Sequence, residues 1–352
     1  VVLQKLFMYK KLLRPILFIL SPEKIHSLVI TFIKIGFKIP GIKWLIKKTT
    51  SVEHPSLHRS ILGLDFKNPI GFAAGFDKNA EVYEDFSAFG FSFIEIGTVT
   101  PKPQSGNPKP RSFRLKKDKA LINRMGFNNK GVVYASKKLK NRTGHIIIGG
   151  NIGKNTLTPN EQAIDDYLFC FKELYDHVDY LVVNISCPNV ANLRHLQDSE
   201  NLSRILSSLM AERKQRNIYK PILLKVSPDL TNEQLDETIS TSVEVGIDGF
   251  IATNTTTSRE NLTTSSEKVS SIGNGGLSGA PLTNRSTEVI RYIYEKTSGK
   301  KPIIGVGGIM TTEDAIEKLN AGASLIQIYT GFIYTGPMFV KRINKELIRR
   351  SK

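Results

Sequence analysis

From residue 61 onward, this chain alternates short apolar runs with segments of helical periodicity, and this alternation restricts the fold more than any other feature. Eight runs have the length and character of buried strands, at 69–72, 91–97, 146–150, 180–185, 221–226, 249–253, 302–306 and 324–329. Eight helix-like segments separate and follow them, at 79–88, 128–141, 161–177, 199–216, 231–245, 284–297, 312–320 and 336–350. These units predict a parallel (β/α)8 TIM barrel over residues 51–352. A doubly wound sheet is the alternative, but it does not require eight near-equal units, and no GxGxxG motif opens the first one.

In such a barrel the chemistry lies at the C-terminal ends of the strands, so the residues after each apolar run are site candidates. These ends are rich in Asn, Thr, Lys and Gly and poor in carboxylates, and they occupy 73–78, 98–101, 151–154, 184–189, 225–228, 253–255, 307–308 and 329–330. Such a ring suits a planar, anionic, amide-rich ligand, and it lacks the His and carboxylate clusters of a metal site. Gly307-Gly308, Tyr329-Thr330 and a glycine-rich turn at 275–279 predict a phosphate-bearing cofactor, because glycine lets backbone amides approach an anion.

Cys187, in the stretch NISCPN at 184–189, is the strongest candidate for a catalytic group. Its thiol stands on a strand-end loop between amide side chains and can act as an acid or a base. The alternative is a small buried hydrophobe, which we expect for Cys170 inside the helix 161–177. Lys225 ends the fifth apolar run near the barrel axis, where its charge needs a structural ion pair or an anionic ligand. Two cysteines are too few for a disulfide framework or an iron–sulfur cluster, and they indicate a reducing compartment.

The formal charge is +17 and the pI about 9.7, and the positive excess is concentrated in two segments. Residues 1–50 hold ten Lys/Arg and one acid, and residues 101–142, with a basic hairpin at 113–121, hold thirteen and one. In residues 1–50, apolar residues recur at helical spacing between the lysines, and Ser21-Pro22 suits the cap and first residue of a helix. No uncharged run reaches the ~18 residues of a membrane span. We predict a pair of short amphipathic helices on an anionic membrane surface, with simple packing on the barrel as the alternative.

The barrel resembles dihydroorotate dehydrogenase in eight ordered motifs, which are AAGFDKN at 73–79, NRMGFNN at 123–129, NISCPN at 184–189, LLKVSPDL at 223–230, ATNTT at 252–256, GGLSG at 275–279, GVGGI at 305–309 and IQIYTG at 326–331. Together they cover nearly the whole barrel. Ser21-Pro22-Glu23 and His26 resemble the membrane-associated, quinone-reducing class 2 branch, in which the N-terminal extension forms a tunnel for the quinone.

The resemblance implies an FMN cofactor, the substrate dihydroorotate with its product orotate, and a membrane quinone as electron acceptor. By resemblance, FMN is held by Ala74, Gly75, Thr98, Asn151, Asn184, Lys225, Thr253, Gly279, Gly308, Tyr329 and Thr330. Dihydroorotate is held by Lys78, Asn123, Arg124, Met125, Gly126, Phe127, Asn184, Asn189, Asn254 and Thr255. The position of Cys187 is that of the base which removes a proton from C5, while a hydride passes from C6 to FMN. His26 and Arg114 match positions on the quinone path.

Cys187 also marks a departure, because class 2 members usually carry serine there and the soluble class 1 enzymes carry cysteine. A class 1-like enzyme that uses fumarate or another soluble acceptor is therefore the nearest alternative, although the basic N-terminal segment argues against it. An FMN-dependent tRNA dihydrouridine synthase is more remote, because the positive charge does not lie on an appended RNA-binding domain, and we expect no nucleic-acid partner. A non-catalytic membrane scaffold would leave the Asn/Lys ring unexplained. By resemblance we expect a monomer, bound peripherally to the cytoplasmic side of the cell membrane through residues 1–50.

Overall fold

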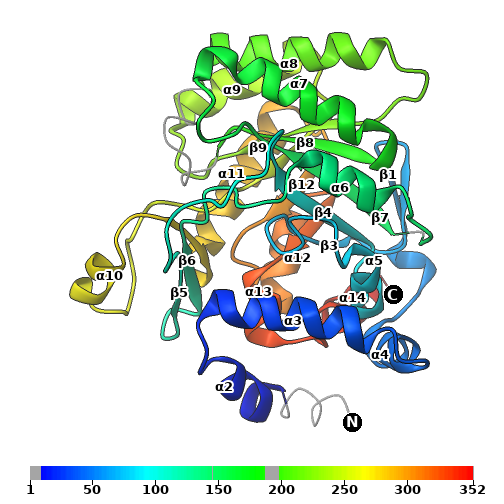
Figure 1. The fold of residues 1–352 in the computed structure, drawn as a ribbon, viewed down its shortest axis with the longest axis vertical. Helices are drawn as coiled ribbons and strands as arrows, with labels where there is room; N and C mark the ends of the chain where they lie inside the picture. Colours follow the sequence, from blue (N-terminus) through cyan, green and yellow to red (C-terminus); the bar gives the residue numbers. More distant parts are fainter. Residues whose placement is uncertain (1–8, 145, 187–197, 352) are drawn as a thin grey trace.

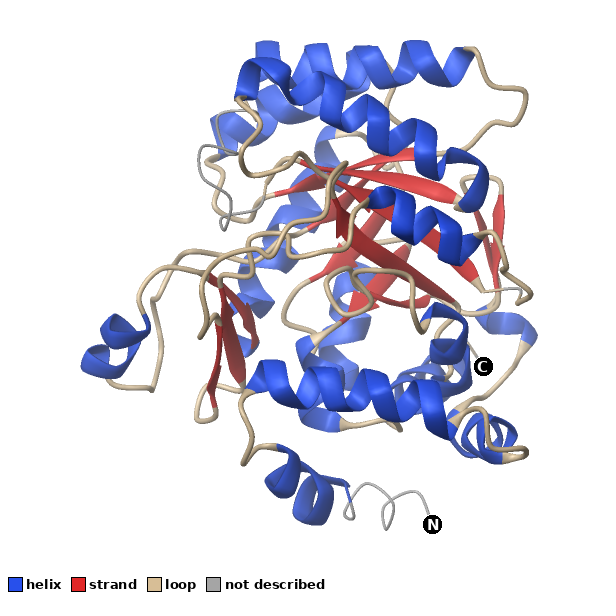
Figure 2. Cartoon of the chain, viewed as in Figure 1, coloured by secondary structure: helices blue, strands red, loops and turns tan. Residues whose placement is uncertain are grey.

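The structure is a computed structural model that describes residues 9–144, 146–186 and 198–351. Its centre is a closed barrel of parallel strands (Figure 1, Figure 2). The barrel strands are β3 Ile70–Phe72, β4 Phe93–Val99, β7 Ile147–Ile152, β8 Tyr180–Asn184, β9 Ile222–Val226, β10 Gly249–Ala252, β12 Ile303–Val306 and β13 Leu325–Ile328. They follow one another around the barrel in chain order, and β13 pairs with β3 to close it. The predicted barrel is confirmed, and each strand overlaps its predicted run.

Helices surround the barrel, and each predicted helical segment contains one. They are α5 Tyr83–Phe86, α6 Val132–Leu139, α7 Ala163–Leu174, α8 Ser199–Lys214, α9 Asn232–Val245, α11 Thr283–Lys296, α12 Thr312–Asn320 and α14 Phe339–Arg350. The first is much shorter than the predicted segment 79–88. The reason is Asp77, whose carboxylate accepts hydrogen bonds from the backbone amides of Glu81 at 2.7 Å and Val82 at 2.8 Å. These bonds hold the chain in a turn that delays the start of the helix.

The core has two layers, because side chains alternate between the inside and the outside of the barrel. The outer layer lies between strands and helices and includes Phe72, Ile94 and Leu181. The inner layer includes Phe93 and Val182. A hairpin of β1 Arg59–Ile61 and β2 Leu64–Phe66 packs below it, and the ring of Phe66 lies 5.2 Å from that of Phe93 at the start of β4. The N-terminal end of the barrel is therefore covered, and the C-terminal end is left for a site.

A small antiparallel sheet stands beside that C-terminal end. It consists of β5 Ser112–Leu115, β6 Ala120–Asn123 and β11 Gly276–Gly279, with β6 in the middle. The first two strands confirm the predicted hairpin. The predicted turn at 275–279 is wrong, because most of this stretch is strand β11. Its glycines permit a close approach of two backbones: a Cβ on Gly279 would lie 2.4 Å from the carbonyl oxygen of Lys119.

The N-terminal segment forms three successive helical parts rather than two. They are a π-helical turn at Tyr9–Leu13 continued by α2 Arg14–Leu17, then α3 Pro22–Gly36, and then α4 Ile42–Thr50, which the sequence pattern does not predict. Gly41, at φ +86°, turns the chain into α4. The predicted cap is confirmed, because the Ser21 hydroxyl accepts a hydrogen bond from the amide of Lys24 at 3.4 Å.

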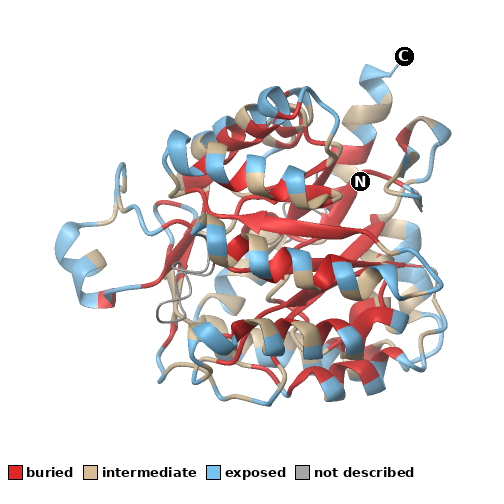
Figure 3. Ribbon diagram, turned by 90° about the horizontal axis from the view of Figure 1, so that it is seen from above, coloured by how far each residue is buried: buried red, intermediate tan, exposed pale blue. Residues whose placement is uncertain are grey.

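Helix α3 packs on the barrel through one face and exposes another. Ile33 belongs to the outer core layer, and Val29 packs against it, whereas Leu28, Phe32 and Ile35 are exposed. Figure 3 shows the corresponding pattern on the helices around the barrel, with buried inner faces and exposed outer faces. Among the described residues, no single helix has the length and apolar character of a membrane span, although the bent pair 9–17 and 22–36 meets those criteria together, at an angle of 112°.

Candidate active site

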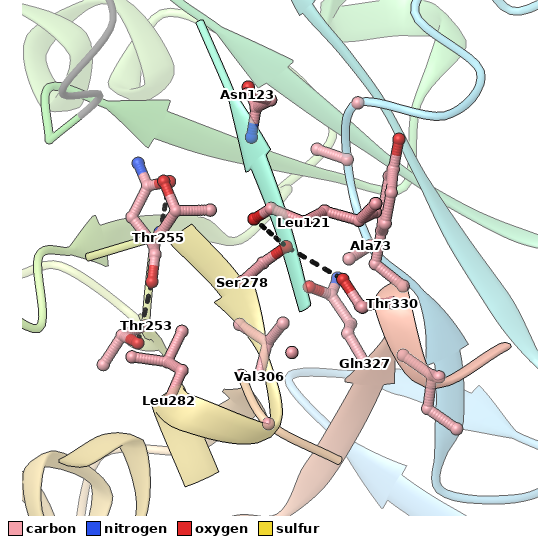
Figure 4. A pocket seen from close by; sticks show the side chains of 18 of the residues that line it. Ala73, Leu121, Asn123, Thr253, Thr255, Ser278, Leu282, Val306, Gln327 and Thr330 are labelled. Carbon is pink, nitrogen blue, oxygen red and sulfur yellow. Dashed lines mark hydrogen bonds between the residues drawn. The ribbon is translucent and has the colours of Figure 1, made fainter. Parts of the chain in front are cut away.

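A cleft opens at the C-terminal ends of the barrel strands, between the barrel and the small sheet (Figure 4). The space between its lining residues is about 1180 Å³ when the open mouth is counted. In Figure 4, Asn123 and Leu121 extend from β6, Ser278 from β11, and Gln327 and Thr330 from β13 and the segment after it.

Most of the predicted site residues line this cleft. Those predicted to bind the cofactor are Ala74, Gly75, Thr98, Asn184, Lys225, Thr253, Gly279, Gly308, Tyr329 and Thr330. Those predicted to bind substrate are Lys78, Asn123, Met125, Gly126, Phe127, Asn184, Asn254 and Thr255. The remaining predicted cofactor residue, Asn151, lies behind the lining and bonds to residues that form it. Residues that are far apart in the sequence thus share one space, and their individual roles remain predictions.

Inside the barrel, Glu95 on β4 gathers three polar side chains below the cleft. Its Oε1 accepts a hydrogen bond from Nδ2 of Asn151 at 2.6 Å and lies 3.4 Å from Nζ of Lys225. Its Oε2 accepts a hydrogen bond from Nε2 of Gln327 at 2.7 Å. Glu95 is fully buried, so the lysine balances its charge. The sequence predicted either a structural ion pair or an anionic ligand for Lys225. The structure shows the ion pair, with Glu95, and Lys225 also borders the cleft.

A row of amide and hydroxyl groups links the C-terminal ends of four strands, β4, β7, β8 and β10, along one wall. Nδ2 of Asn184 donates to Oγ1 of Thr98 at 2.9 Å and to Oδ1 of Asn151 at 3.2 Å. Nδ2 of Asn254 donates in turn to Oδ1 of Asn184 at 3.2 Å. Each amide is held in one orientation by its neighbours, so the donors and acceptors that it keeps for a ligand are fixed in direction. This arrangement suits a planar ring that carries N–H and C=O groups at its edge.

The glycine pair after β12 forms a backbone cradle at another wall. A Cβ on Gly308 would lie 2.3 Å from Cα of Thr283, so no side chain fits there. The carbonyl oxygens of Gly307 and Gly308 accept hydrogen bonds from the hydroxyls of Ser286 and Thr283, each at 2.7 Å. In one trans peptide the N–H and the C=O point in opposite directions, so the amides of Gly308 and Ile309 point away from α11, and both residues line the cleft. A phosphate group fits such a cradle, because backbone amides commonly bind it.

Lys78, on the loop after β3, brings a second cation to the cleft. Within the described part of the chain, its ammonium has no hydrogen-bond or ion-pair partner. Burial, assisted by the charge of Arg111, lowers the pKa of Lys78 to about 8, against the opposing charges of Glu23 and Asp77. An enclosed cation without a protein partner indicates an anionic ligand.

The loop that follows β6 is held in a strained conformation against the cleft. Phe127 has φ +50°, which is rare for a bulky residue, and it is buried. Its carbonyl oxygen accepts hydrogen bonds from Nδ2 of Asn129 at 2.7 Å and from Nε2 of Gln104 at 3.3 Å. Nε2 of Gln104 also donates to the carbonyl oxygen of Gly126 at 2.9 Å. Backbone strain that the surroundings enforce in this way is common at ligand-binding sites.

Besides Asn151, three predicted residues that the structure describes lie outside the lining. The Arg124 guanidinium donates to backbone carbonyls of two neighbouring loops, so it holds the loop in place rather than facing the cleft. Nε2 of His26 lies 2.8 Å from the carbonyl oxygen of Phe76, and burial lowers the pKa of His26 to about 4, so its ring is neutral. Arg114 donates to the carbonyl oxygen of Leu20 at 2.6 Å. His26 and Arg114 both lie where the N-terminal segment meets the barrel, and their place on a quinone path remains a prediction.

Two predicted residues, Cys187 and Asn189, lie outside the described residues. Cys170 is buried in α7, as expected, and burial raises the pKa of its thiol. In the described ranges, no group of three or more His, Cys, Asp or Glu side chains is arranged to hold a metal ion.

Glu95 and Gln327 are functional candidates that the search of strand ends missed. Both lie inside the predicted runs 91–97 and 324–329, before the predicted strand ends. A usable signal was present, because each is a polar residue inside an apolar run, in the alternate positions that face the barrel interior. Ser278 was missed for another reason: it faces the cleft from β11, which was predicted as a turn.

The fold and the cleft agree with the relatives that comparison finds. A sequence model of dihydroorotate dehydrogenase matches residues 56–350. A dihydroorotate dehydrogenase (quinone) from Christiangramia forsetii is 55% identical over 343 residues, which cover 97% of this chain and 99% of that protein. Another, from Nocardia farcinica, is 43% identical over 346 residues, which cover 97% and 94%. The crystal structure of DHODH from Eimeria tenella in complex with ferulenol matches with a TM-score of 0.85 at 38% identity, covering 94% of this chain and 91% of that one. The chain therefore belongs to the dihydroorotate dehydrogenase family.

Proposed function

We propose that this chain oxidises (S)-dihydroorotate to orotate in de novo pyrimidine (UMP) biosynthesis and passes the electrons to a quinone. The names of the relatives from C. forsetii and N. farcinica, which match nearly the whole chain, support this activity. The structural observation that carries it is the cleft, in which Lys78, a cation with no partner among the described residues, a fixed row of amides and a glycine cradle surround one space. A small anionic pyrimidine beside a phosphate-bearing cofactor matches these three features.

FMN is the cofactor that these residues fit. The backbone at Gly307 and Gly308 would hold its phosphate, and Thr98 and Asn184 would bond to the edge of its ring. When bound, FMN supplies the two-electron redox chemistry. Lys225 would place its ammonium next to the ring, where a positive charge favours the accumulation of negative charge, and Glu95 keeps that ammonium in position.

Dihydroorotate would lie between the cofactor and the loop 123–127. Lys78 would pair with its carboxylate, because it is an enclosed cation without a described partner. Asn123, Asn184 and Asn254 would bond to the ring N–H and C=O groups. Closure of the cleft by substrate and cofactor would exclude water from the reacting carbon atoms.

Cys187 would remove the proton from C5 of dihydroorotate. A cysteine thiol has an ordinary pKa of about 8.5, so a few per cent is thiolate at neutral pH without any assistance. A serine in the same position starts several units higher and depends more on its surroundings. The cysteine is therefore compatible with a quinone-linked enzyme that needs less help at its base.

The N-terminal segment, residues 1–50, would dock peripherally on an anionic membrane and admit the quinone. The exposed Leu28, Phe32 and Trp44 supply apolar contact, and the many lysines of this segment supply charge. His26 and Arg114 would border the route from the membrane to the cofactor. We expect docking on the cytoplasmic side of the cell membrane, with the protein as a monomer.

Steady-state oxidation of dihydroorotate by the purified protein in mild detergent tests this proposal, with either a ubiquinone analogue or fumarate as the sole acceptor. We expect turnover with the quinone and none with fumarate. Turnover with fumarate alone would contradict quinone as the acceptor and indicate a class 1-like enzyme. Failure to oxidise dihydroorotate with either acceptor would contradict the proposed function as a whole.

A further inference from the structure

Glu23 forms an enclosed ion pair between the N-terminal segment and the barrel. It is the only acid in residues 1–50 and lies in the first turn of α3. Its Oε1 accepts hydrogen bonds from Nη2 of Arg111 at 2.7 Å and from Nε at 3.2 Å, and Nζ of Lys109 lies 3.6 Å away. The Arg111 side chain is only 7% exposed. An ion pair of this kind holds its geometry better than an exposed one, because water competes less for both partners.

Arg111 also supports the loop 123–127, which we assign to the substrate. Its Nη1 donates to the carbonyl oxygen of Asn107 at 3.0 Å, and the amide of Asn107 donates to the carbonyl oxygen of Met125 at 3.1 Å. The backbone carbonyl of Arg111 accepts a hydrogen bond from the amide of Arg124 at 2.9 Å. A Cβ on Gly126 would lie 2.7 Å from Oδ1 of Asn107, so the turn at 105–107 packs directly on the loop. Arg111 thus connects α3 to the backbone that presents Met125 and Gly126 to the cleft.

Charge connects the same groups to Lys78. The charged and titratable groups that act on its ammonium are Arg111 from the loop before β5, Glu23 and His26 from α3, and Asp77 from its own loop. Arg111 opposes the positive charge of Lys78, whereas Glu23 and Asp77 favour it. His26 is neutral, because burial lowers its pKa to about 4. Without Glu23, the charge of Arg111 would act on Lys78 with only Asp77 to offset it.

We propose that Glu23 is a positioning residue for the anionic substrate. Through its ion pair, Glu23 fixes Arg111, which holds the loop 123–127. The charge of Glu23 also offsets the effect of the positive charge of Arg111 on Lys78. Helix α3 and the substrate end of the cleft are then coupled through one ion pair. This inference rests on the proposed function, because it takes a carboxylate-bearing pyrimidine as the ligand.

Glu23→Gln tests the proposal, because it keeps the shape of the side chain and removes its charge. Orotate is titrated into the flavin-loaded wild-type and variant enzymes between pH 6 and pH 9.5, and binding is followed by the change in flavin absorbance. We expect about five- to fiftyfold weaker orotate binding at pH 8. The pH above which affinity falls should also move down by about half a unit, since the charge that favours protonated Lys78 is gone. The KM for dihydroorotate should rise with it, while the KM for quinone and the flavin content stay close to wild type.

Two further variants separate positioning from general damage. Glu53→Gln removes an exposed acid that pairs with Lys47 at 3.8 Å, and it should change nothing. At pH 6, where Lys78 is protonated, orotate binding in the double variant Glu23→Gln with Arg111→Gln should be no weaker than in Arg111→Gln alone, because Glu23 holds the loop through Arg111. Additive losses, an unchanged pH limb in Glu23→Gln, or equal losses of orotate and flavin would each overturn the inference. Absence of orotate binding by the wild type would instead overturn the proposed function.

Discussion

Gly308→Ala should weaken FMN binding far more than a matched glycine replacement elsewhere. Gly308 lies in the cradle that we assign to the phosphate, and its φ is +71°. Gly273, at the end of α10 Ser266–Ile272, has a φ of +76° but does not line the cleft. Both positions have a positive φ, which Gly273 combines with a ψ of −154°, so Gly273→Ala reports the cost of a positive φ at a position outside the cleft.

The size of the effect follows from the space at each position. Alanine at a positive φ costs about 1–3 kcal/mol at each site. At Gly308 the new Cβ would meet the backbone of Thr283 at 2.3 Å, whereas at Gly273 nothing lies within 4 Å. Relieving such an overlap in a packed region costs about 1–3 kcal/mol more. If the cradle shifts to relieve it, FMN should bind about 5- to 150-fold more weakly to Gly308→Ala than to Gly273→Ala.

Quenching of flavin fluorescence on titration with apoprotein measures this difference, and riboflavin serves as the control ligand. Riboflavin lacks the phosphate, so its affinity should differ little between the two variants. Thermal unfolding of the apoproteins reports the cost to the fold separately. Equal FMN affinities for the two variants, or an equal loss for riboflavin and FMN in Gly308→Ala, would refute the assignment of the cradle to the phosphate.

Three further outcomes follow from the charges and thiols of the site. Lys78 has a pKa of about 8 and loses its charge as the pH rises through that value. The affinity for orotate should therefore fall by up to about tenfold per pH unit above pH 8. An orotate affinity that stays constant from pH 7 to pH 10 would be inconsistent with the role of Lys78. Lys225→Met leaves Glu95 buried without its cation, so it should lower the free energy of unfolding by about 3–5 kcal/mol. It should also make the bound flavin harder to reduce. An unchanged reduction potential would count against the assignment of Lys225 to the flavin ring. Cys187→Ala should slow the anaerobic loss of flavin absorbance on adding dihydroorotate by about 100-fold or more, yet leave reoxidation by quinone nearly intact; equal losses in both half-reactions would remove Cys187 as the base.

The barrel could be predicted because its signal is repeated and local. Each strand is buried on both faces, so it reads as a continuous apolar run, and each run is followed by a helix with its own periodicity. Strand β11 lacks such an apolar run. It holds two glycines in four residues, and its partner β6 lies more than 150 positions earlier in the chain, so only tertiary pairing reveals it. Helix α4 is short and rich in lysine, and the glycine before it resembles the end of a segment.

The candidate site could be predicted where its residues follow strands, and not where they lie within them. Asn184, Lys225 and Thr253 follow the rule that strand ends carry chemistry, and the structure places all three in one cleft. Glu95 and Gln327 obey a different rule, which is that an inward position in a closed barrel has no solvent, so a polar residue there must bond to other polar residues. Applying that rule to the sequence requires knowing which of the two alternating faces of each strand points inward.

The sequence pattern cannot indicate the connection between the N-terminal segment and the cleft, because this connection depends on one contact, between Glu23 and Arg111, which are 88 positions apart. Glu23 reads as an ordinary acid near the start of a helix, where it suits the helix dipole, and Arg111 reads as one cation among thirteen in a basic segment. Only their pairing in a confined space gives either of them a distinct role. The charge excess of this chain therefore has two separable parts: exposed lysines suited to an anionic surface, and a buried arginine that pairs with Glu23 and whose charge also acts on Lys78, a cation that lines the cleft.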